Sequence, residues 1–175
     1  MGVTLRPLRR DDFGTLGEWL REPLVHEWWH DDPDPVALEQ QYGAAIDGRE
    51  PTALRIGEHD GVPVGFLQWY LLADEPDYTA ELTPFLPIPH DAWSLDYLVG
   101  SPAHRRQGVG TALVQAAVAT IGASPIVVPV QAGNFASAAV LRRAGFTLAA
   151  EADLEPDNPG HSRAHLVFTR SPSRA

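Results

Sequence analysis

The alternation of apolar and polar residues predicts a chain rich in strands. Alternating runs are typical of half-buried strands, and short continuous apolar runs bounded by turn residues are typical of buried ones. Seven segments have one of these patterns: residues 3–8, 52–58, 62–72, 93–99, 126–130, 146–150 and 164–170. The second and third segments are joined through Asp60-Gly61, which is a strong signal for a hairpin.

Helical periodicity fills much of the chain between these strands. Asp11 or Asp12 can cap a helix that carries Leu16, Trp19 and Leu20 on its apolar side. Three further helices are predicted over residues 36–46, 108–121 and 135–144.

Two segments fit neither period. Residues 24–29 form a short aromatic segment, which the Asp-Pro cluster of residues 31–35 breaks. Residues 73–91 are rich in proline and acidic residues and are interpreted as a long loop. Loops of this length in compact domains tend to be functional.

The order of the elements predicts a mixed α/β sheet. The strand, helix and strand between residues 93 and 130 require a parallel crossover, whereas the hairpin at residues 52–72 is antiparallel. We expect a central sheet of about seven strands flanked by about four helices. This single domain covers residues 1–171, and residues 172–175 are expected to be a disordered tail.

The composition is that of one domain without a covalent staple. The chain has 175 residues, of which 44% are hydrophobic and 21% are charged. It contains no cysteine, which excludes disulfides, a thiolate nucleophile and a cysteine-ligated zinc. No segment approaches the roughly 20 apolar residues of a membrane span, and the first ten residues lack a signal-peptide stretch. We therefore expect a cytoplasmic protein without a membrane partner.

The charge argues against nucleic acid as a partner. The net charge is −10, whereas nucleic-acid binding normally requires a basic patch. An acidic cleft attracts small cationic molecules, although an acidic surface also serves solubility alone. All 13 basic residues are arginine, so no mechanism can depend on lysine.

The loop at residues 105–111, between a predicted strand and a predicted helix, carries the chemistry. Gly108 and Gly110 allow the backbone to approach a ligand closely, and the free N–H groups at the helix start favour a bound anion. Arg105 and Arg106 add positive charge beside them. The glycine spacing of dinucleotide-binding loops and the Gly-Lys-Ser/Thr of ATPases are both absent, so the loop predicts a different kind of pyrophosphate cradle.

This loop resembles motif A of the GNAT acetyltransferases, Arg-x-x-Gly-x-Gly after a strand that ends in Val-Gly. A second similarity, to the family's Asn-x-x-Ala … Gly-Phe signature, begins at Asn134 and Ser137 and ends at Phe146. Short matches at residues 25–29, 65–70 and 95–96 resemble the type-Ib group of aminoglycoside 6′-N-acetyltransferases. The resemblance covers nearly the whole chain. It implies a GNAT fold, a monomer or homodimer, and acetyl-CoA as the co-substrate.

The resemblance also implies roles for individual residues. Asp96 is expected to take a proton from the substrate amine, directly or through water; its structural alternative is a cap or a partner for an arginine. The two central parallel strands are expected to splay apart and hold the pantetheine arm of acetyl-CoA, with backbone groups of Leu98 and Gly100 binding it. The expected contacts of acetyl-CoA are Leu98, Val99, Gly100, Arg105, Arg106, Gln107, Gly108, Val109, Gly110, Thr111, Asn134 and Ser137.

The expected substrate contacts combine acidic and aromatic side chains: Glu27, Trp28, Trp29, Gln68, Tyr70, Glu81, Asp96, Asp153 and Asp157. We expect one tryptophan of the pair at the substrate site and the other in the core. For the acids in loops, the alternative to substrate binding is a solvent-exposed position without a functional role. His26 and His30 are spaced like metal ligands on one helical face, but no third ligand pattern follows, so no metal is expected.

Two positions depart from the family pattern. Leu141 stands where many members have a tyrosine that protonates the leaving thiolate, so Tyr97, a water or no acid at all serves that step. Pro129 stands where the type-Ib group has an aspartate, which leaves the acceptor open. The resemblance implies an N-acetyltransferase that acetylates a primary amine of an aminoglycoside antibiotic, at its 6′-position. The alternative acceptors are a siderophore precursor, a polyamine or a protein N-terminus, and the alternative outside the enzymes is a non-catalytic acyl-CoA sensor.

Overall fold

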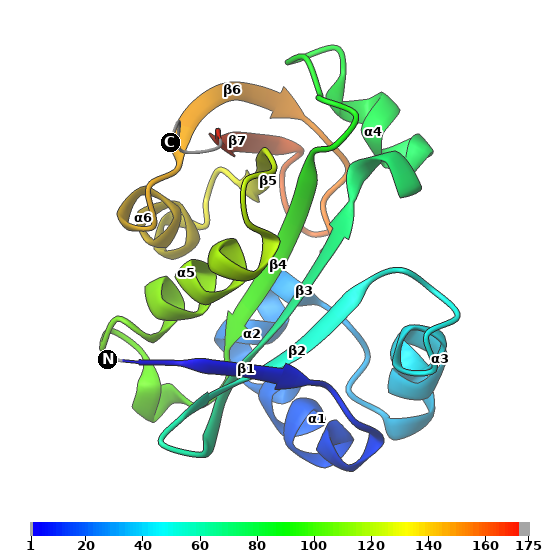
Figure 1. Ribbon diagram of the computed structural model, residues 1–175, viewed down its shortest axis with the longest axis vertical. Helices are drawn as coiled ribbons and strands as arrows, with labels where there is room; N and C mark the ends of the chain where they lie inside the picture. Colours follow the sequence, from blue (N-terminus) through cyan, green and yellow to red (C-terminus); the bar gives the residue numbers. More distant parts are fainter. Residues whose placement is uncertain (1, 172–175) are drawn as a thin grey trace.

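A computed structural model describes residues 2–171, which form one seven-stranded sheet covered by helices on both faces (Figure 1). The strand order across the sheet is β1-β2-β3-β4-β5-β7-β6. The strands are β1 (Thr4–Pro7), β2 (Ala53–His59), β3 (Val62–Leu71), β4 (Trp93–Val99), β5 (Ile126–Gln131), β6 (Thr147–Asp153) and β7 (Ala164–Arg170). The seven predicted strands and the mixed α/β fold are therefore confirmed. The tail predicted to be disordered, residues 172–175, lies outside the described residues.

The helices number six within the described residues, not the expected four. They are α1 (Phe13–Arg21), α2 (Pro23–Trp29), α3 (Pro35–Ile46), α4 (Pro76–Leu82), α5 (Val109–Ile121) and α6 (Phe135–Arg143). Short 3₁₀ turns lie at Arg10–Asp12, Leu72–Asp74 and Pro102–His104. Within residues 2–171, no helix combines the length and the apolar character that a membrane crossing requires.

The two helices that the sequence prediction missed, α2 and α4, both begin with proline. Pro23 and Pro76 occupy the first turn of their helices, where a proline ring fits and no N–H is needed. The prediction took the prolines of residues 73–91 only as signs of a loop, so this segment was wrongly interpreted as a long loop. Leu82 is fully buried, which fixes α4 against the sheet.

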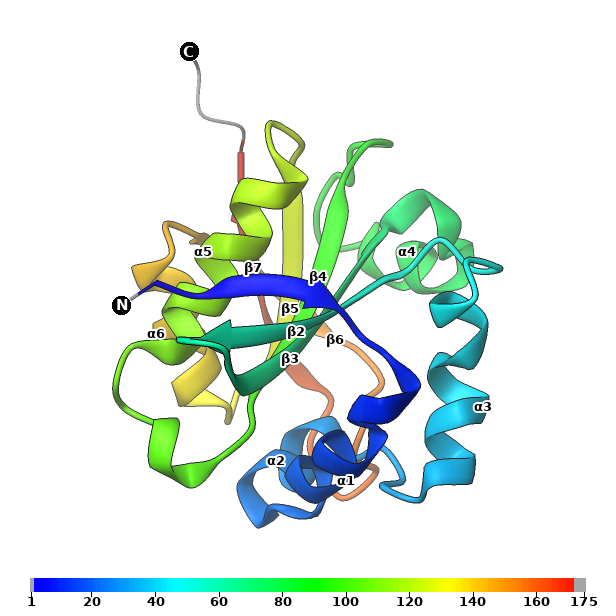
Figure 2. The same cartoon turned by 60° about the horizontal axis from the view of Figure 1, so that its bottom comes forward.

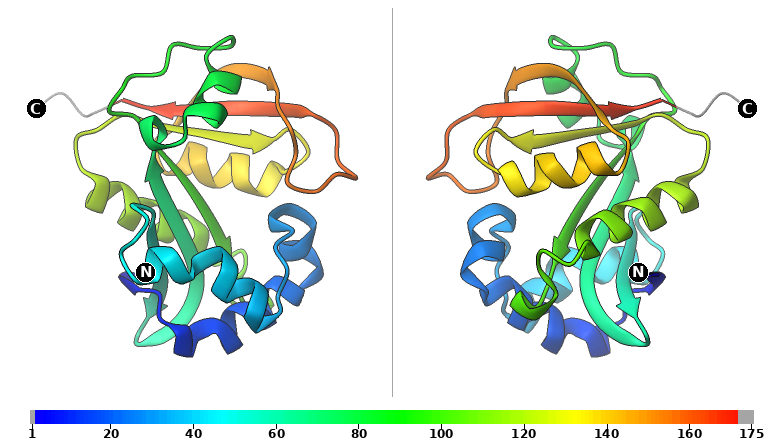
Figure 3. Two further views of the ribbon diagram at one scale, coloured as in Figure 1. Left: turned by 90° about the vertical axis from the view of Figure 1, so that its right-hand side faces the viewer. Right: turned by 90° about the vertical axis from the view of Figure 1, so that its left-hand side faces the viewer.

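Only one pair of neighbouring strands in the sheet is parallel. β4 and β5 are paired at a single register position, Trp93 opposite Ile126, whereas the other neighbours form antiparallel ladders. Beyond that position the strands diverge, and Figure 3 shows β5, β6 and β7 crossing the direction of β3 and β4. The splay expected of the two central strands is thus present.

Each face of the sheet has its own core. Figure 2 shows α5 and α6 on one side and α1 to α4 on the other. The core under α5 and α6 includes Leu113, Leu141 and Phe168, and the core under α1 and α3 includes Leu16 and Phe66. A third cluster joins α4 to β5, β6 and β7. The two faces are therefore closed separately, except where β4 and β5 part.

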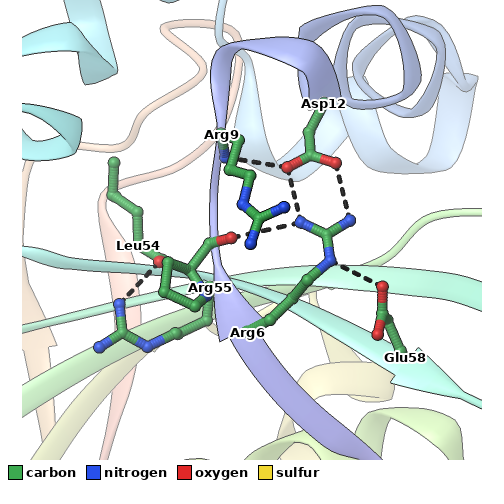
Figure 4. A network of polar contacts seen from close by, with 7 residues as sticks. Arg6, Arg9, Asp12, Leu54, Arg55 and Glu58 are labelled. Atoms are coloured by element: carbon green, nitrogen blue, oxygen red, sulfur yellow. Dashed lines mark hydrogen bonds and ion pairs between the residues drawn. The ribbon is translucent and has the colours of Figure 1, made fainter. Parts of the chain in front are cut away.

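Arg6 ties the sheet edge to the start of α1 (Figure 4). Its Nη1 and Nη2 atoms donate to the two carboxylate oxygens of Asp12 at 2.7 Å each, and its Nε donates to Glu58 Oε1 at 2.7 Å. The backbone N–H of Arg9 also donates to Asp12 Oδ2 at 2.9 Å. Burial would raise the pKa of Asp12, but the bonds from Arg6 and Arg9 prevail and lower it below 3.8.

The substitution Asp12→Asn tests this network. An amide cannot accept from both guanidinium nitrogens, so we expect the free energy of unfolding to fall by about 1–2 kcal/mol near pH 7. Because the pKa of Asp12 is depressed in the folded state, its contribution is complete above the unfolded pKa and disappears as the pH falls below 3.8. Urea unfolding from pH 7 to 3 measures the difference. The exposed neighbour Asp11→Asn is the control, and an equal loss in both variants would contradict the assignment.

Candidate active site

A cavity of about 510 Å³ opens on the face that carries α2 and α3 and reaches down to the divergence of β4 and β5. Six of its lining side chains are carboxylic acids: Asp31, Glu50, Glu75, Asp96, Glu155 and Asp157. None of the described residues that line it is an arginine. A concave wall with charge of one sign concentrates cations, so the cavity is built for a positively charged ligand.

Asp96 lies on the floor of this cavity. It is opposite Gln68 in the β3–β4 ladder, and Gln68 Nε2 donates to Asp96 Oδ2 at 2.9 Å. Burial raises the pKa of Asp96 to about 6, the Gln68 bond opposes this, and the charges of Asp157 and Asp31 add to the rise. Among its described neighbours Asp96 forms no pair with an arginine, which removes that structural alternative. A carboxylate with a pKa near 6 is suited to accept a proton at neutral pH.

Tyr97 lines the same cavity from the side of α6. Its hydroxyl is 2.7 Å from Ser137 Oγ and donates to the Ser137 carbonyl at 3.2 Å. Burial raises the pKa of Tyr97, so the hydroxyl keeps its proton at neutral pH. Leu141, two turns from the start of α6, is fully buried in the core and offers no polar group to the cavity.

Aromatic rings form one wall of the cavity: Trp28, Trp29, Tyr42, Tyr70 and Tyr78. Both tryptophans line it, although only one was expected there. Trp28 packs against the His161 ring at a centroid distance of 4.7 Å, and Trp29 meets the edge of Phe66 at 5.4 Å. Aromatic faces attract ammonium groups, so this wall complements the carboxylates.

The loop between β6 and β7 contacts α2 beside the cavity, and we call these contacts the clasp. Asn158 Nδ2 donates to the Glu27 carbonyl at 3.2 Å, and His161 Nε2 lies 3.9 Å from Glu27 Oε1. Glu27 is therefore part of this clasp, and its exposed side chain does not line the cavity.

The predicted pyrophosphate loop has the backbone that its glycines suggested. Gly108 has φ 83° and Arg106 has φ 59°, both in the left-handed region. Ala112 N–H donates to the Gly108 carbonyl as the first bond of α5, so the preceding amides of the helix start have no acceptor within the helix. These amides belong to Val109, Gly110 and Thr111.

The side chains of the loop contribute less than its backbone. Gln107 Nε2 donates to the Ala103 carbonyl at 2.6 Å, and Arg105 lies 3.5 Å from Glu22. Arg106 is exposed. Gly110 packs against α6, where a Cβ would stand 3.2 Å from Val140. These side-chain contacts hold the loop, and the amides at the start of α5 remain without an acceptor within the helix.

The end of β4 leads from the cavity towards this loop. Leu98 and Val99 pack their side chains into the two opposite cores. Gly100 lies under Trp19, whose ring would be 2.2 Å from an added Cβ, and its N–H already donates to the Val64 carbonyl at 3.0 Å. The Gly100 carbonyl accepts from Arg105 Nη2 at 3.4 Å, so a ligand could bind Gly100 only at the second lone pair of this oxygen. The expectation that Gly100 offers backbone groups to acetyl-CoA is thereby restricted to its carbonyl.

The start of α6 lies at the other side of the divergence. Asn134 Oδ1 accepts from Ser137 N–H at 3.0 Å and caps the helix, and both residues line the cavity. Together with the α5 loop they frame a path from the helix start to Asp96.

Besides Glu27, two further acids expected at the substrate site lie elsewhere. Glu81 is exposed on α4 and does not line the cavity. Asp153 points outward because its neighbours Ala152 and Leu154 are buried, and it pairs with Arg163. Of the other expected contacts, Gln68, Tyr70 and Asp157 do line the cavity.

Sequence reasoning missed several lining residues: Asp31, Tyr42, Tyr78 and His165. Asp31 was assigned only to a helix-breaking cluster, and Tyr78 to a loop. In the sequence His165 appeared only as one residue of the predicted strand 164–170. In the structure it is 8% exposed, and its Nδ1 lies 2.8 Å from the Arg163 carbonyl. In the described part of the chain, no three His, Asp or Glu side chains are arranged to hold a metal ion.

Known proteins resemble this chain in sequence and in fold. The model of the acetyltransferase (GNAT) domain family matches residues 9–154. The aminoglycoside N(6′)-acetyltransferases type 1 of Klebsiella pneumoniae and Serratia marcescens are each 27% identical over 177 aligned positions, covering 96% of this chain and 83% of theirs.

Solved structures share the fold. The aminoglycoside acetyltransferase AAC(6′)-Ib in complex with coenzyme A and kanamycin has a TM-score of 0.80 at 21% identity, covering 97% of this chain and 95% of its own. Spermidine N-acetyltransferase from Vibrio cholerae, in complex with coenzyme A and spermine, has a TM-score of 0.74 at 16% identity, covering 98% and 96%.

The environment of Asp96 is testable without a substrate. Its pKa is raised from 3.8 to about 6 on folding, so the wild-type protein loses stability as the pH rises through that interval and no more above it. We expect Asp96→Asn to become more stable than the wild type across the same interval, by about 1–3 kcal/mol at pH 7. Urea unfolding from pH 4 to 8 measures this, with the exposed Asp77→Asn as control. A constant difference between wild type and Asp96→Asn across the range would refute the raised pKa.

Proposed function

The chain belongs to the acetyltransferase (GNAT) domain family, and on this premise we propose that it acetylates a primary amine of a small polycationic acceptor, using acetyl-CoA. The acceptor that we propose is an aminoglycoside, at its 6′-amine. The observation that carries the proposal is Asp96, whose pKa is near 6, on the floor of a cavity whose charged lining is predominantly acidic.

The loop before α5 supports acetyl-CoA as the donor. Amides at a helix start that have no acceptor within the helix suit a pyrophosphate, and Gly108 leaves the space beside the backbone open. The divergence of β4 and β5 continues from this loop to Asp96. Leu98 and Gly100 would offer backbone groups along it, and Asn134 and Ser137 would border it.

The chemistry needs a proton acceptor and a proton donor. Bound acetyl-CoA supplies an acetyl thioester; nitrogen bonds to the acyl carbon and the carbon–sulfur bond breaks. Asp96, ionised above its raised pKa, accepts the proton that the acceptor ammonium must lose. Tyr97 keeps its proton and lies beside Ser137, so we assign it as the donor to the departing sulfur in place of the absent tyrosine at Leu141. The second proton that the nitrogen loses when the amide forms returns to Tyr97.

The cavity and the curated relatives together favour an aminoglycoside. Six carboxylates and a wall of aromatic rings complement a sugar that carries several ammonium groups. The curated relatives named for aminoglycoside N(6′)-acetylation cover 96% of the chain. A polyamine is the second candidate, because the cavity charge suits it equally and the spermidine acetyltransferase shares the fold.

Steady-state release of coenzyme A from acetyl-CoA, with kanamycin, tobramycin, spermidine and peptides as acceptors, tests the proposal. We expect turnover with the two aminoglycosides, and a loss in kcat/KM of about 10²- to 10⁴-fold in Asp96→Asn because the proton acceptor is removed. The kcat/KM of the wild type should rise with pH, with a midpoint near pH 6, and reach a plateau above it because Asp96 is then ionised. Turnover with spermidine alone would transfer the proposal to polyamines. Acetyl-CoA binding without turnover of any amine would replace it with an acyl-CoA sensor.

Gly108→Ala tests the pyrophosphate loop against a matched control. Gly108 and Gly48 both have left-handed backbones, φ 83° and 71°, and nothing within 4 Å of an added Cβ. Each substitution should therefore cost about 1 kcal/mol of stability. Only Gly108→Ala is expected to raise the KM for acetyl-CoA, by about 10-fold, because its methyl group stands in the ligand's approach. Equal KM values in the two variants would remove the loop from the binding site.

A further inference from the structure

Asp31 enters the cavity through a strained turn. α2 ends at His30, whose φ of 60° lies in the left-handed region that a residue other than glycine rarely adopts. This conformation reverses the chain and brings Asp31 to the cavity wall. Such backbone costs on the order of 1–3 kcal/mol and persists where the surrounding structure holds it.

The carboxylate of Asp31 is held by two neutral donors. The Tyr42 hydroxyl and Trp29 Nε1, the latter at 2.8 Å, both donate to Asp31 Oδ2. Both donor rings meet the buried Phe66 ring edge-on at 5.4 Å, so the core fixes them. Burial, and next the charge of Asp31, raise the pKa of Tyr42, so its hydroxyl remains a donor.

No cation neutralises Asp31 within residues 2–171. None of the ion pairs of the described chain includes Asp31. Its second oxygen, Oδ1, accepts no hydrogen bond from a described residue. The charge of Asp31 contributes to the raised pKa of both Asp96 and Asp157, so these carboxylates interact unfavourably across one space.

A second side chain of the cavity also lacks a partner. His165 is more than nine-tenths buried, and with its Nδ1 hydrogen bonded to the Arg163 carbonyl, the Nε2 atom is the acceptor. The ring lines the cavity, and no described residue donates to Nε2. The cavity therefore presents fixed acceptors at separate places, which a ligand with several N–H donors would satisfy.

We propose that Asp31 anchors a second ammonium group of the acceptor, while the reacting amine lies at Asp96. This inference rests on the proposed function and specifies its substrate class: an acceptor with at least two amines. Asp31 is thus a specificity-determining residue, and its rigid hold by Tyr42 and Trp29 sets where the second charge lies. A monoamine of similar size gains nothing from it.

Asp31→Asn tests the anchor, with Asp32→Asn as a matched control. Asparagine at position 31 keeps an oxygen for Tyr42 and Trp29 but has no charge. Asp32 is exposed, lies outside the cavity lining and uses its Oδ1 only to accept from the Asp34 N–H at 2.9 Å, so its variant makes the same change in net charge. Kanamycin and 6-amino-6-deoxyglucose are the two acceptors, since the second has no amine beyond the one that reacts.

We expect Asp31→Asn to raise the KM for kanamycin by about 10- to 100-fold with little change in kcat, and to leave kcat/KM for the monoamine sugar within about 2-fold. Tyr42→Phe removes one of the two fixing donors and should raise the KM for kanamycin by a smaller factor. Asp32→Asn should change neither acceptor. An equal effect of Asp31→Asn on both acceptors, or on neither, would overturn the anchor while leaving the acetyltransferase function intact.

Calorimetric binding separates the two proposals. Kanamycin and the monoamine sugar are titrated into the wild type, Asp31→Asn and Asp32→Asn, each saturated with coenzyme A. The anchor predicts tighter binding of kanamycin in the wild type and in Asp32→Asn, and a preference reduced by about 10-fold or more in Asp31→Asn. If no amine is turned over, the proposed function fails, but this comparison still decides the anchor. A preference for kanamycin that is as large in Asp31→Asn as in Asp32→Asn would refute it.

Discussion

The cavity exists because β4 and β5 are paired at one register position only. In an unbroken ladder successive residues of a strand point to opposite faces of the sheet, so neighbours cannot line one space. Asp96 and Tyr97 are such neighbours, and both line the cavity because β5 has moved away beside them. Leu95 and Leu98 keep the strand anchored in the two opposite cores. The divergence therefore places the proposed proton acceptor, Asp96, and the proposed proton donor, Tyr97, in one cavity although both lie on a regular strand.

The electrostatic arrangement of the site opposes the stability of the fold. Asp31 raises the pKa of both Asp96 and Asp157, and Asp157 raises that of Asp96, so these carboxylates cost free energy when no ligand is bound. The fold compensates at a distance: the Arg6 network fastens the sheet edge, and separate cores close the two faces. The clasp between α2 and the loop before β7 then joins segments on either side of the divergence. The Arg6 network and the cores therefore stabilise a fold whose cavity holds Asp31, Asp96 and Asp157 without ion-pair partners among the described residues.

Sequence reasoning succeeded where one residue type determines the local structure. The glycines of the α5 loop, the Asp60-Gly61 turn and the apolar periods of the strands all predicted what the structure contains. It failed where a residue's role depends on a distant partner. Asp31 looked like a helix breaker because Tyr42 and the splayed sheet that make it a cavity residue are not visible in its neighbours. Glu81 and Asp153 looked like cleft acids for the converse reason, since nothing local shows that they face outward.

The position of β7 has a consequence for how the chain acquires its shape during synthesis. β7 follows β6 in the sequence, yet it lies between β5 and β6, which are not paired with one another. Until β7 has left the ribosome, β6 has no neighbour in the sheet with which to pair and the third hydrophobic cluster lacks Val167. The nascent chain thus has a sheet with two open edges near its C-terminal half, and it completes the wall that holds His165 in a late, non-local step of the kind that slows folding.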